Sequence, residues 1–489
     1  MRNKLYLSCM MLLMALLLTV CAPIQKKPTP VALYTPTIFD VKVDKVASAA
    51  RLKDQRPNII LILTDDQPYY MTDYMPTVKN ELITKGVQFQ YGFDTTPLCC
   101  PSRTSILTGQ YAHNHQILTN GLPNGGATLF KDRPNLGNWM QAAGYYTGYL
   151  GKFLNNYSDV TPKGHVIPGW NQWDVFLDKS GYEFFYNYSI SENGKKVRYP
   201  KSKANFSADI LSQKAVNFIR DAEDKPFFLF LAYDNPHSPY LSAPRHADTF
   251  RTGSSMEWIP YRPPNFNEPD ISDKPAYVHN LVPYTQGKMD ATYKQLERSL
   301  LSVDDGVASI LNALKKTGLS DNTIIVYMSD NGLTLGEHRF GPDKDCPYEE
   351  CIRVPFVVYG PKYFSPRLDT THMVANIDLA PTFAELAGAK IPTHVDGISL
   401  VPVLKDSAAP WRHDLLLEHW PAVDGVGATI PQFSCVRTAQ WKYVEYTTGE
   451  HELYNLQTDP FELTNVYNSP ENKNIIAALK QQLEILKKQ

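Results

Sequence analysis

The feature that most constrains the fold is a set of short, nearly continuous apolar runs separated by segments of helical character. The first run, Asn58–Leu63, is apolar at every position after Asn58 and is followed by Thr64, Asp65 and Asp66. Runs without polar alternation are typical of central parallel strands that are buried on both faces. Further strand-like runs are Tyr145–Leu150, Phe227–Ala232, Thr323–Met328 and Val354–Val358.

Helix-like stretches lie between these runs. They are Leu136–Ala143, Asp209–Ala222, Tyr293–Lys316 and Asp378–Ala387. Strands that alternate with helices predict an α/β fold, in which a mostly parallel sheet is flanked by helices on both faces. The long segment 241–290 is dense in Pro, Asn, Asp and Tyr and has little periodicity. Because long irregular loops in compact domains are often functional, we expect it at the substrate mouth.

The pattern changes at about residue 411. Short strand-like pieces, Leu415–Glu418 and Trp441–Tyr446, are followed by a helix-like stretch from Asn474 to Lys488. We therefore predict a main domain over 56–410 and a smaller α+β subdomain over 411–489. A chain of 489 residues is long enough for both.

The N-terminus predicts export. Arg2 and Lys4 precede the apolar run Leu5–Val20, which indicates a signal peptide over 1–21. A membrane-anchoring helix is the alternative, although the run is slightly short for a span of about 20 residues.

The end of this segment also resembles a bacterial lipoprotein signal. In Leu18-Thr19-Val20-Cys21 the cysteine would be acylated, but Val20 stands where a small residue is usual. Residues 22–55 have no clear period and predict a linker. We expect a protein that is secreted, periplasmic or held at the cell surface by an N-terminal lipid, its only route to a membrane.

The net charge of the chain does not favour binding to a polyanion. The formal net charge is −2, and we find no repeat, charge block or low-complexity tract. This balance argues against a nucleic acid partner, so any recognition of an acidic substrate must be local.

Five cysteines lie beyond Cys9 and Cys21: Cys99, Cys100, Cys346, Cys351 and Cys435. An odd number in an exported protein suggests at least one thiol with its own purpose. Cys346 and Cys351 are near enough in sequence to form a disulfide, and two free buried thiols are an equally good interpretation.

The tract Cys99-Cys100-Pro101-Ser102-Arg103 places two thiols, a proline, a hydroxyl and a guanidinium in five successive positions. Pro101 suits the first position of a helix, where its missing N–H costs nothing. Cys99 would then sit just ahead of a helix N-terminus, where free N–H groups favour an anion. Arg103 adds a fixed cation with a planar fork of donors suited to an oxyanion. A buried cysteine in an ordinary loop-to-helix turn is the alternative.

Acidic residues end two of the predicted strands. Asp65 and Asp66 follow the first run, and Asp330 and Asn331 follow Thr323–Met328. Ligands of open α/β sheets bind beyond the carboxyl ends of the strands. Three carboxylates there would repel one another without a cation, and oxygen ligands suit Ca²⁺ or Mg²⁺. Turn and cap residues are the alternative interpretation.

The Cys99–Arg103 tract followed by Leu107-Thr108-Gly109 resembles the signature of type I, formylglycine-dependent sulfatases. The resemblance runs from about Pro57 to Tyr467 and is closest to the branch of N-acetylglucosamine-6-sulfatases and extracellular heparan endosulfatases. Other supporting stretches are Gly151–Asn155, His165–Trp170, Leu301–Asp305, Ala375–Thr382 and Glu452–Leu456. The resemblance implies an alkaline-phosphatase-like fold.

It also implies the nucleophile and the metal site. A formylglycine-generating enzyme would oxidise Cys99, not Cys100, to Cα-formylglycine (3-oxoalanine). The metal ligands implied are Asp65, Asp66, the modified residue 99, Asp330 and Asn331, with Ca²⁺ expected and Mg²⁺ as the alternative.

Three further residues gain roles from the resemblance. Lys152 would contact the formylglycine and the sulfate, Lys344 would be a second sulfate-binding lysine, and His237 would lie near the leaving-group oxygen. Without the resemblance, we would interpret both lysines as solvated and the histidine as a loop residue bonded to the backbone. Asn114 and His115 are further candidates for lining the pocket. Many family members have a histidine where this chain has Leu154, but leucine is typical of the branch named above.

The implied reaction is hydrolysis of a sulfate ester, such as that of N-acetylglucosamine 6-sulfate in a glycan. One hydroxyl of the hydrated formylglycine would attack sulfur, and His237 would protonate the departing alcohol oxygen. The second hydroxyl would then lose its proton, so that the aldehyde re-forms and sulfate leaves. A phosphodiesterase or phosphonate hydrolase of the same superfamily, and a non-catalytic glycan-binding protein, are the alternatives. Aromatic residues that could stack on sugars are Tyr182, Phe184, Phe185, Tyr186, Tyr188 and Trp258.

Overall fold

The computed structural model describes residues 35–39, 56–160, 162, 164–177, 184–222, 225–251, 254, 256–392, 394–422 and 430–489. The predicted signal peptide over 1–21, the acylation site Cys21, most of the 22–55 linker and Tyr182 lie outside the described residues. In the part of the chain that is described, no helix is both long and apolar enough to cross a membrane.

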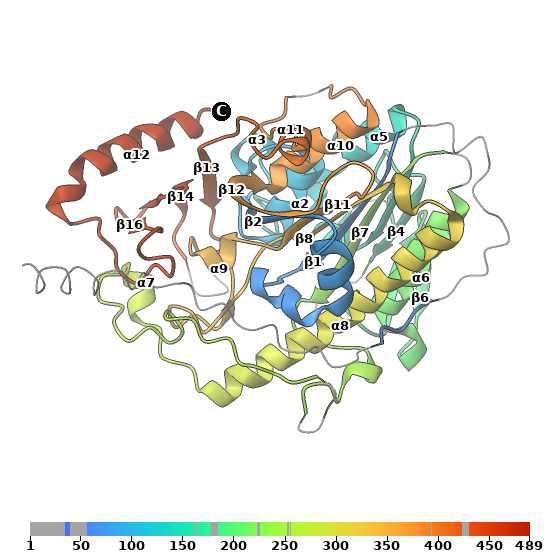
Figure 1. Ribbon diagram of the computed structural model, residues 1–489, viewed down its shortest axis with the longest axis horizontal. Helices are drawn as coiled ribbons and strands as arrows, with labels where there is room; N and C mark the ends of the chain where they lie inside the picture. The colour runs from blue at the N-terminus through green and yellow to red at the C-terminus, as the bar shows by residue number, and fades with distance from the viewer. Residues whose placement is uncertain are drawn as a thin grey trace, which may run out of the picture.

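The centre of the molecule is a ten-stranded sheet in the order β12-β2-β11-β8-β1-β7-β3-β4-β5-β6 (Figure 1). Its middle strands β8, β1, β7, β3 and β4 run parallel, whereas β11, β5 and β6 are antiparallel to their neighbours. The strands are β1 (Asn58–Asp65), β2 (Val87–Phe93), β3 (Tyr146–Gly151), β4 (Gln172–Phe176), β5 (Tyr188–Glu192), β6 (Lys195–Tyr199), β7 (Phe227–Pro236), β8 (Thr323–Ser329), β11 (Phe356–Tyr359) and β12 (Arg367–Ala375).

Helices cover both faces of this sheet, and β1 shows why. Its residues Ile59, Leu61 and Leu63 belong to one hydrophobic core, while Ile60 and Ile62 belong to the other. Helices α2 (Cys99–Thr108), α5 (Leu136–Ala142) and α10 (Leu379–Ala387) contribute to the first core, and α6 (Ser207–Asp221) and α8 (Gln286–Thr317) to the second. The predicted α/β architecture, with a strand buried on both faces, is confirmed.

A second, four-stranded antiparallel sheet follows, with the order β13-β14-β15-β16. Its strands are β13 (Asp414–His419), β14 (Phe433–Thr438), β15 (Trp441–Tyr446) and β16 (His451–Asn455), and helix α12 (Lys473–Leu486) packs on it. A third hydrophobic core joins this sheet to Phe93, Tyr348 and Ile352 of the first part. The smaller C-terminal α+β unit is confirmed, and a boundary at 410/411 remains our proposed division.

Shorter elements complete the fold. The α-helices are α3 (Ala112–His115), α4 (Ala127–Phe130), α7 (Ala276–His279), α9 (Glu349–Ile352) and α11 (Val401–Lys405). Strands β9 (Thr334–Leu335) and β10 (Pro342–Asp343) form a two-stranded ribbon. The remaining short helices are the π-helix η3 (Val78–Ile83) and the 3-10 helices η2 (Tyr69–Tyr74), η4 (Tyr157–Asp159), η6 (Lys203–Asn205), η7 (Pro244–His246), η8 (Ser320–Asn322), η9 (Asn376–Asp378) and η10 (Pro470–Asn472).

Two expectations need correction. The predicted strand Val354–Val358 is β11 in the structure, which covers Phe356–Tyr359 and is antiparallel to both β8 and β2. A continuous apolar run shows burial on both faces and carries no information about direction. Helix α8 begins at Gln286, earlier than the predicted Tyr293, so it takes the last residues of the irregular segment 241–290.

Candidate active site

The Cys99 side chain lies at the first turn of α2. The helix begins at Cys99 itself, after Leu98 in an extended conformation. The prediction that Pro101 takes the first helical position is therefore wrong, since Pro101 is the third residue. Its missing N–H still costs nothing there, because the first N–H groups of a helix have no partner within the helix.

Three charged groups surround the buried Cys99 sulfur. Lys344 Nζ lies 2.9 Å from Sγ, Lys152 Nζ 3.9 Å, and Asp65 Oδ1 3.6 Å. Burial raises the pKa of the Cys99 thiol well above its ordinary value and Asp65 raises it further, although Lys152 and Lys344 oppose this. The thiol is therefore protonated at neutral pH and is a poor nucleophile as it stands.

The neighbouring Cys100 has different surroundings. Its Sγ accepts a hydrogen bond from the Asn155 N–H at 3.0 Å and lies 3.5 Å from the Asn155 side-chain oxygen. Of the two adjacent cysteines, Cys99 is the one whose sulfur contacts both lysines.

The Arg103 side chain is buried near Cys99 and forms hydrogen bonds to three segments of the chain. Its Nε donates to Asp330 Oδ2 at 2.7 Å, Nη2 to Asp65 Oδ2 at 2.8 Å, and Nη1 to the Lys152 carbonyl at 2.7 Å. The planar guanidinium satisfies all three acceptors at once, which a lysine cannot do.

Oxygen donors gather beside Cys99 at the ends of β1 and β8. Asp66 has a left-handed backbone (φ 61°), which turns the chain so that two successive residues of a strand end can face one site. The Asp66 N–H donates to Asp330 Oδ1 at 3.3 Å, and Asn331 Nδ2 donates to Asp66 Oδ1 at 2.7 Å. The structure thus brings Asp65, Asp66, Asp330 and Asn331 together.

This donor set fits a hard divalent cation. Asn331 Oδ1 is buried and has no hydrogen-bond partner among the described residues, which leaves it free to coordinate. Burial, together with the charge of Asp65, raises the pKa of Asp330 to about 6. Buried carboxylate and amide oxygens gathered at one point are the ligands that Ca²⁺ and Mg²⁺ take in proteins.

Lys152, Lys344 and His237 lie in three different loops, and their side chains all approach the carboxylates of Asp65 and Asp66. Lys152 Nζ is 2.5 Å from Asp65 Oδ2, Lys344 Nζ is 2.6 Å from Asp66 Oδ1, and His237 Nε2 is 3.6 Å from Asp66 Oδ2. The His237 Nδ1 lies 2.9 Å from the Ser238 carbonyl and donates to it. Burial, followed by Lys152, lowers the pKa of His237.

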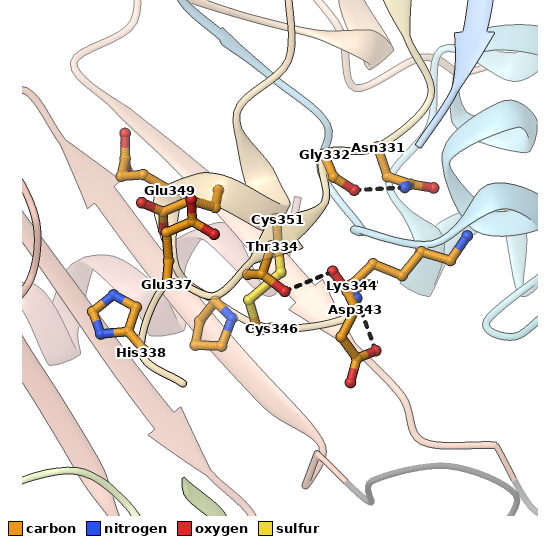
Figure 2. The surroundings of a disulfide bond; sticks show 12 residues. Asn331, Gly332, Thr334, Glu337, His338, Asp343, Lys344, Cys346, Glu349 and Cys351 are labelled. Carbon is orange, nitrogen blue, oxygen red and sulfur yellow. Dashed lines mark hydrogen bonds between the residues drawn. A yellow bond between two sulfur atoms is a disulfide. The ribbon is translucent and has the colours of Figure 1, made fainter. Parts of the chain in front are cut away.

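A disulfide fixes the loop that carries Lys344. Cys346 and Cys351 are bonded, which resolves the alternative left open by the sequence. In Figure 2 the Lys344 side chain extends away from the disulfide on the side where Asn331 lies. The crosslink joins this loop to α9 and so limits how far the lysine can move.

Comparisons with known proteins agree with this geometry. A family model described as Sulfatase matches residues 57–389, and one described as N-sulphoglucosamine sulphohydrolase, C-terminal, matches residues 336–489. The chain belongs to the sulfatase family. Its enzyme class is therefore that of the sulfuric ester hydrolases.

The sulfatase has relatives of different lengths. It is 34% identical over 459 residues to the human N-acetylglucosamine-6-sulfatase, covering 84% of this chain and 81% of the relative. It is 34% identical over 388 residues to the Drosophila melanogaster extracellular sulfatase SULF-1 homolog, covering 76% of this chain but only 33% of the relative. A structure solved with its substrate D-glucosamine-2-N,6-O-disulfate is 25% identical, with a TM-score of 0.76 over 88% of this chain and 98% of the other.

Two expected pocket residues are held elsewhere in the sulfatase. Asn114 Nδ2 donates to Asp396 Oδ2 at 2.9 Å. His115 is fully buried, its Nε2 lies 3.1 Å from Ser105 Oγ, and its Nδ1 accepts from the Ile117 N–H. Burial lowers the pKa of His115 to about 3. The Asn114 side chain therefore binds the segment that carries Asp396, the His115 side chain binds α2, and neither is among the groups that contact the Cys99 sulfur.

Sequence reasoning missed Asp234, which lies beside Lys152 at the end of β7. Its carboxylate is buried, 3.5 Å from Lys152 Nζ, and neither oxygen accepts a hydrogen bond from the described residues. Burial raises the pKa of Asp234 well above its ordinary value, and Lys152 lowers it only in part. The signal was available, because Asp234 follows an apolar run as Asp65 and Asp330 do.

A second buried group of potential ligands, His338, Glu350 and Glu462, joins the main part to the C-terminal sheet. His338 Nδ1 lies 2.6 Å from Glu268 Oε2, and the Lys442 ammonium is in direct contact with Glu462. Since Lys442 already supplies a cation there, we interpret this group as a structural ion network.

Proposed function

We propose that this sulfatase removes sulfate esters from a glucosamine-containing glycan, with N-acetylglucosamine 6-sulfate as the first substrate to test. The observation that carries the proposal is the Cys99 sulfur, which lies between two lysines and beside a cluster of oxygen donors. The relative named N-acetylglucosamine-6-sulfatase and the structure with D-glucosamine-2-N,6-O-disulfate support the choice of sugar.

The two lysines provide the charge that a sulfate ester needs. Lys152 and Lys344 would bind sulfate oxygens and stabilise the negative charge that develops when sulfur is attacked. Burial would lower the pKa of Lys344, but Asp66 and Cys99 raise it well above its ordinary value. Both ammonium groups therefore stay charged across the working pH range.

The raised pKa of Cys99 makes a reaction through its thiolate unfavourable. Conversion of Cys99 to formylglycine by a maturation enzyme would place an aldehyde at the same position, and addition of one water molecule to it would give geminal hydroxyls. His237 Nε2 lies 3.6 Å from Asp66 Oδ2, and in this proposal His237 would pass a proton to the departing alcohol oxygen. Asp65, Asp66, Asp330 and Asn331 would hold the metal, which we propose to be Ca²⁺. Such a cation would neutralise charge and lower the pKa of a bound hydroxyl.

Export belongs to the same proposal. The Cys346–Cys351 disulfide is typical of proteins that fold in an oxidising compartment. The extracellular sulfatase relative supports this location. We propose that an N-terminal signal directs the enzyme out of the cytoplasm, with acylation of Cys21 as the form to test by mass.

The test is the mass of the tryptic peptide that spans residues 86–103, from protein co-expressed with a formylglycine-generating enzyme. This peptide contains both Cys99 and Cys100, so fragmentation is needed to assign the modified position. We expect an aldehyde in place of the thiol at Cys99, together with sulfate release from N-acetylglucosamine 6-sulfate. The Cys100→Ala variant should keep the modification and Cys99→Ala should lose both.

Two outcomes would overturn the proposal. An unmodified Cys99 with no turnover after co-expression would indicate a glycan-binding protein. Faster hydrolysis of a phosphodiester or phosphonate ester than of any sulfated sugar would indicate the other activity of the superfamily.

A further inference from the structure

A cavity of about 570 Å³ lies where the C-terminal sheet meets the main sheet. Gln90, Tyr91 and Arg353 line it from the main sheet and the end of α9, and Arg437 and Gln457 line it from the C-terminal part. We call it the inter-sheet cavity. Small-molecule sites in proteins occupy about 300–1,000 Å³, so this cavity is large enough for a sugar unit.

Two guanidinium groups of the cavity lie beside the same aromatic ring. The Cζ atom of Arg353 is 5.5 Å from the centre of the Tyr91 ring, and the Cζ atom of Arg437 is 5.4 Å from it. Arg353 also lies over the Tyr69 ring at 4.2 Å. Stacking on aromatic rings orients a guanidinium and leaves the N–H groups at its edge available to a ligand.

The two arginines differ in their partners. Arg437 binds both oxygens of Glu349, at 3.1 Å from Nε and 3.3 Å from Nη2. Arg353 donates from Nε to the Gln90 carbonyl at 2.8 Å, and its two terminal nitrogens have no hydrogen-bond or ion-pair partner among the described residues. Burial would raise the pKa of the Glu349 carboxyl, but Arg437, Lys442 and Arg353 lower it to about 2. One carboxylate therefore serves several cations.

The lining of the cavity carries an excess of positive charge. Within the described parts of the chain, its charged lining residues are Arg353, Arg437 and the single acid Glu349. Glu349 is shared further with Lys442, whose Nζ lies 3.9 Å from Oε1. Arg353 thus keeps a planar fork of donors that suits an oxyanion such as a sulfate group.

Neutral groups complete the lining. The side-chain amides of Gln90 and Gln457 make no hydrogen bond to any residue that the structure describes, and such amides can bind sugar hydroxyls. Tyr91 and Leu456 add apolar surface. The combination of one cation, neutral amides and an aromatic ring suits a sulfated sugar better than a bare ion.

The inter-sheet cavity is near the catalytic site but separate from it. Strand β11 lies between β2 and β8, so two spacings of about 4.8 Å, about 10 Å in all, separate β2 from the strand that leads to Asp330. Tyr69, which stacks on Arg353, comes three residues after Asp66. The groups that contact the Cys99 sulfur are not part of the cavity lining.

We propose that the inter-sheet cavity binds a sulfated sugar unit, with its sulfate group on Arg353. This inference rests on the proposed function for the choice of sugar and adds a site that does not hold the reacting ester. A free sulfate ion has the same oxyanion chemistry, so the test must distinguish the two ligands. It must also distinguish binding from a purely structural role of Arg353 between Tyr69 and Tyr91.

The test uses hydrogen–deuterium exchange with N-acetylglucosamine 6-sulfate as the probe. The protein is the full-length Cys99→Ala variant, so that the probe is not turned over during the measurement. The segments around Arg437 and Gln457 report on the inter-sheet cavity, and those that carry Lys152 and His237 report on the catalytic site.

Two substitutions in this background remove the features that the proposal needs. Arg353→Gln removes the cation, and Arg298→Gln is its matched control, because Arg298 is also half-buried and donates from Nε to a backbone carbonyl, that of Thr249, at 2.7 Å. Ala439→Trp fills the cavity from an exposed lining position and leaves every charge in place, so it tests the proposal even if Arg353→Gln does not fold. Ala408→Trp, at another exposed alanine, is its control.

We expect the probe to slow exchange in both groups of segments of the parent protein. Arg353→Gln should raise the probe concentration that gives half-maximal protection of the cavity segments by about tenfold or more, because a charge-assisted hydrogen bond is lost. Ala439→Trp should abolish this protection. Both controls should behave as the parent does, and unsulfated N-acetylglucosamine should leave the cavity segments unprotected.

Absence of protection in the cavity segments, or equal protection of Arg353→Gln and the parent, would overturn the proposal. Equal protection by unsulfated N-acetylglucosamine would also overturn it, since the sulfate group would then play no part. Inorganic sulfate that protects the cavity segments as fully as the probe at the same concentration would assign the cavity to the free ion instead. Protection of the cavity segments with none at Lys152 and His237 would support this inference and count against the proposed function alone.

Discussion

Replacing Arg103 by lysine tests whether one guanidinium holds the catalytic end of the sheet together. Arg103 makes charged hydrogen bonds of 2.7, 2.8 and 2.7 Å to Asp330, Asp65 and the Lys152 carbonyl, and all of its side chain is buried. A lysine can reach one of these acceptors, so the other two lose their hydrogen bond to residue 103. At about 1.5–3 kcal/mol for each charged hydrogen bond, two lost bonds lower the free energy of unfolding by about 3–6 kcal/mol.

The assay is urea denaturation followed by tryptophan fluorescence, with the free energy of unfolding taken from the midpoint and the slope. A loss of this size leaves a protein of ordinary stability folded in water. The loss should be larger with a chelator than with Ca²⁺, because a bound cation would compensate part of the charge on Asp65 and Asp330.

Arg412→Lys is the matched control. Arg412 is also nearly buried and binds both oxygens of the buried Asp378. This control should lose stability to a comparable degree while keeping turnover per folded molecule, whereas Arg103→Lys should lose both. An unchanged denaturation midpoint for Arg103→Lys, or an equal loss of turnover in Arg412→Lys, would refute the reasoning.

Three further changes give separate outcomes. Asn331→Ala should weaken Ca²⁺ binding by about tenfold or more in calorimetric titration, while Asn58→Ala, at the opposite end of β1, should not. Asp234→Asn should reduce kcat/KM for the sulfated sugar but raise the free energy of unfolding by about 1 kcal/mol, because it removes a buried carboxylate without hydrogen-bond partners; equal or lower stability would contradict this. Burial raises the pKa of Asp304 to about 7, so the folded state holds this proton more tightly than the unfolded state and loses stability as pH rises from about 4 to about 7. Asp304→Asn should flatten that part of the stability profile, and an unchanged slope would assign the pH dependence to other groups.

Much of the site could be predicted from the sequence because several of its charged residues lie at the ends of strands. Asp65 is the last residue of a strand, Asp330 and Lys152 come directly after one, and parallel strands deliver such residues to one edge of the sheet. Asp234 comes two residues after the apolar run Phe227–Ala232, near the end of β7, so the same regularity applies to it.

Other residues could not be placed from their neighbours in sequence. His115 follows the signature closely, yet the turn after α2 points its ring at Ser105 inside the protein. Lys344 is separated from Cys99 by most of the main domain, and only its loop brings the ammonium within 2.9 Å of the sulfur. Sequence distance gives no measure of either arrangement.

The sequence by itself determined the layered architecture and the kind of chemistry. Local hydrophobicity predicts that a strand is buried on both faces, and the Cys99–Arg103 tract places a thiol at a helix start four residues before a fixed cation. The tertiary structure decided which charged groups surround these side chains and how their pKa values shift. Asp65 is an example: burial would raise its pKa, but the nearby cations of Lys152 and Arg103 hold it well below the ordinary value. Those cations lie far from Asp65 along the chain, and electrostatic interactions depend on distance in space, so only the folded chain sets them.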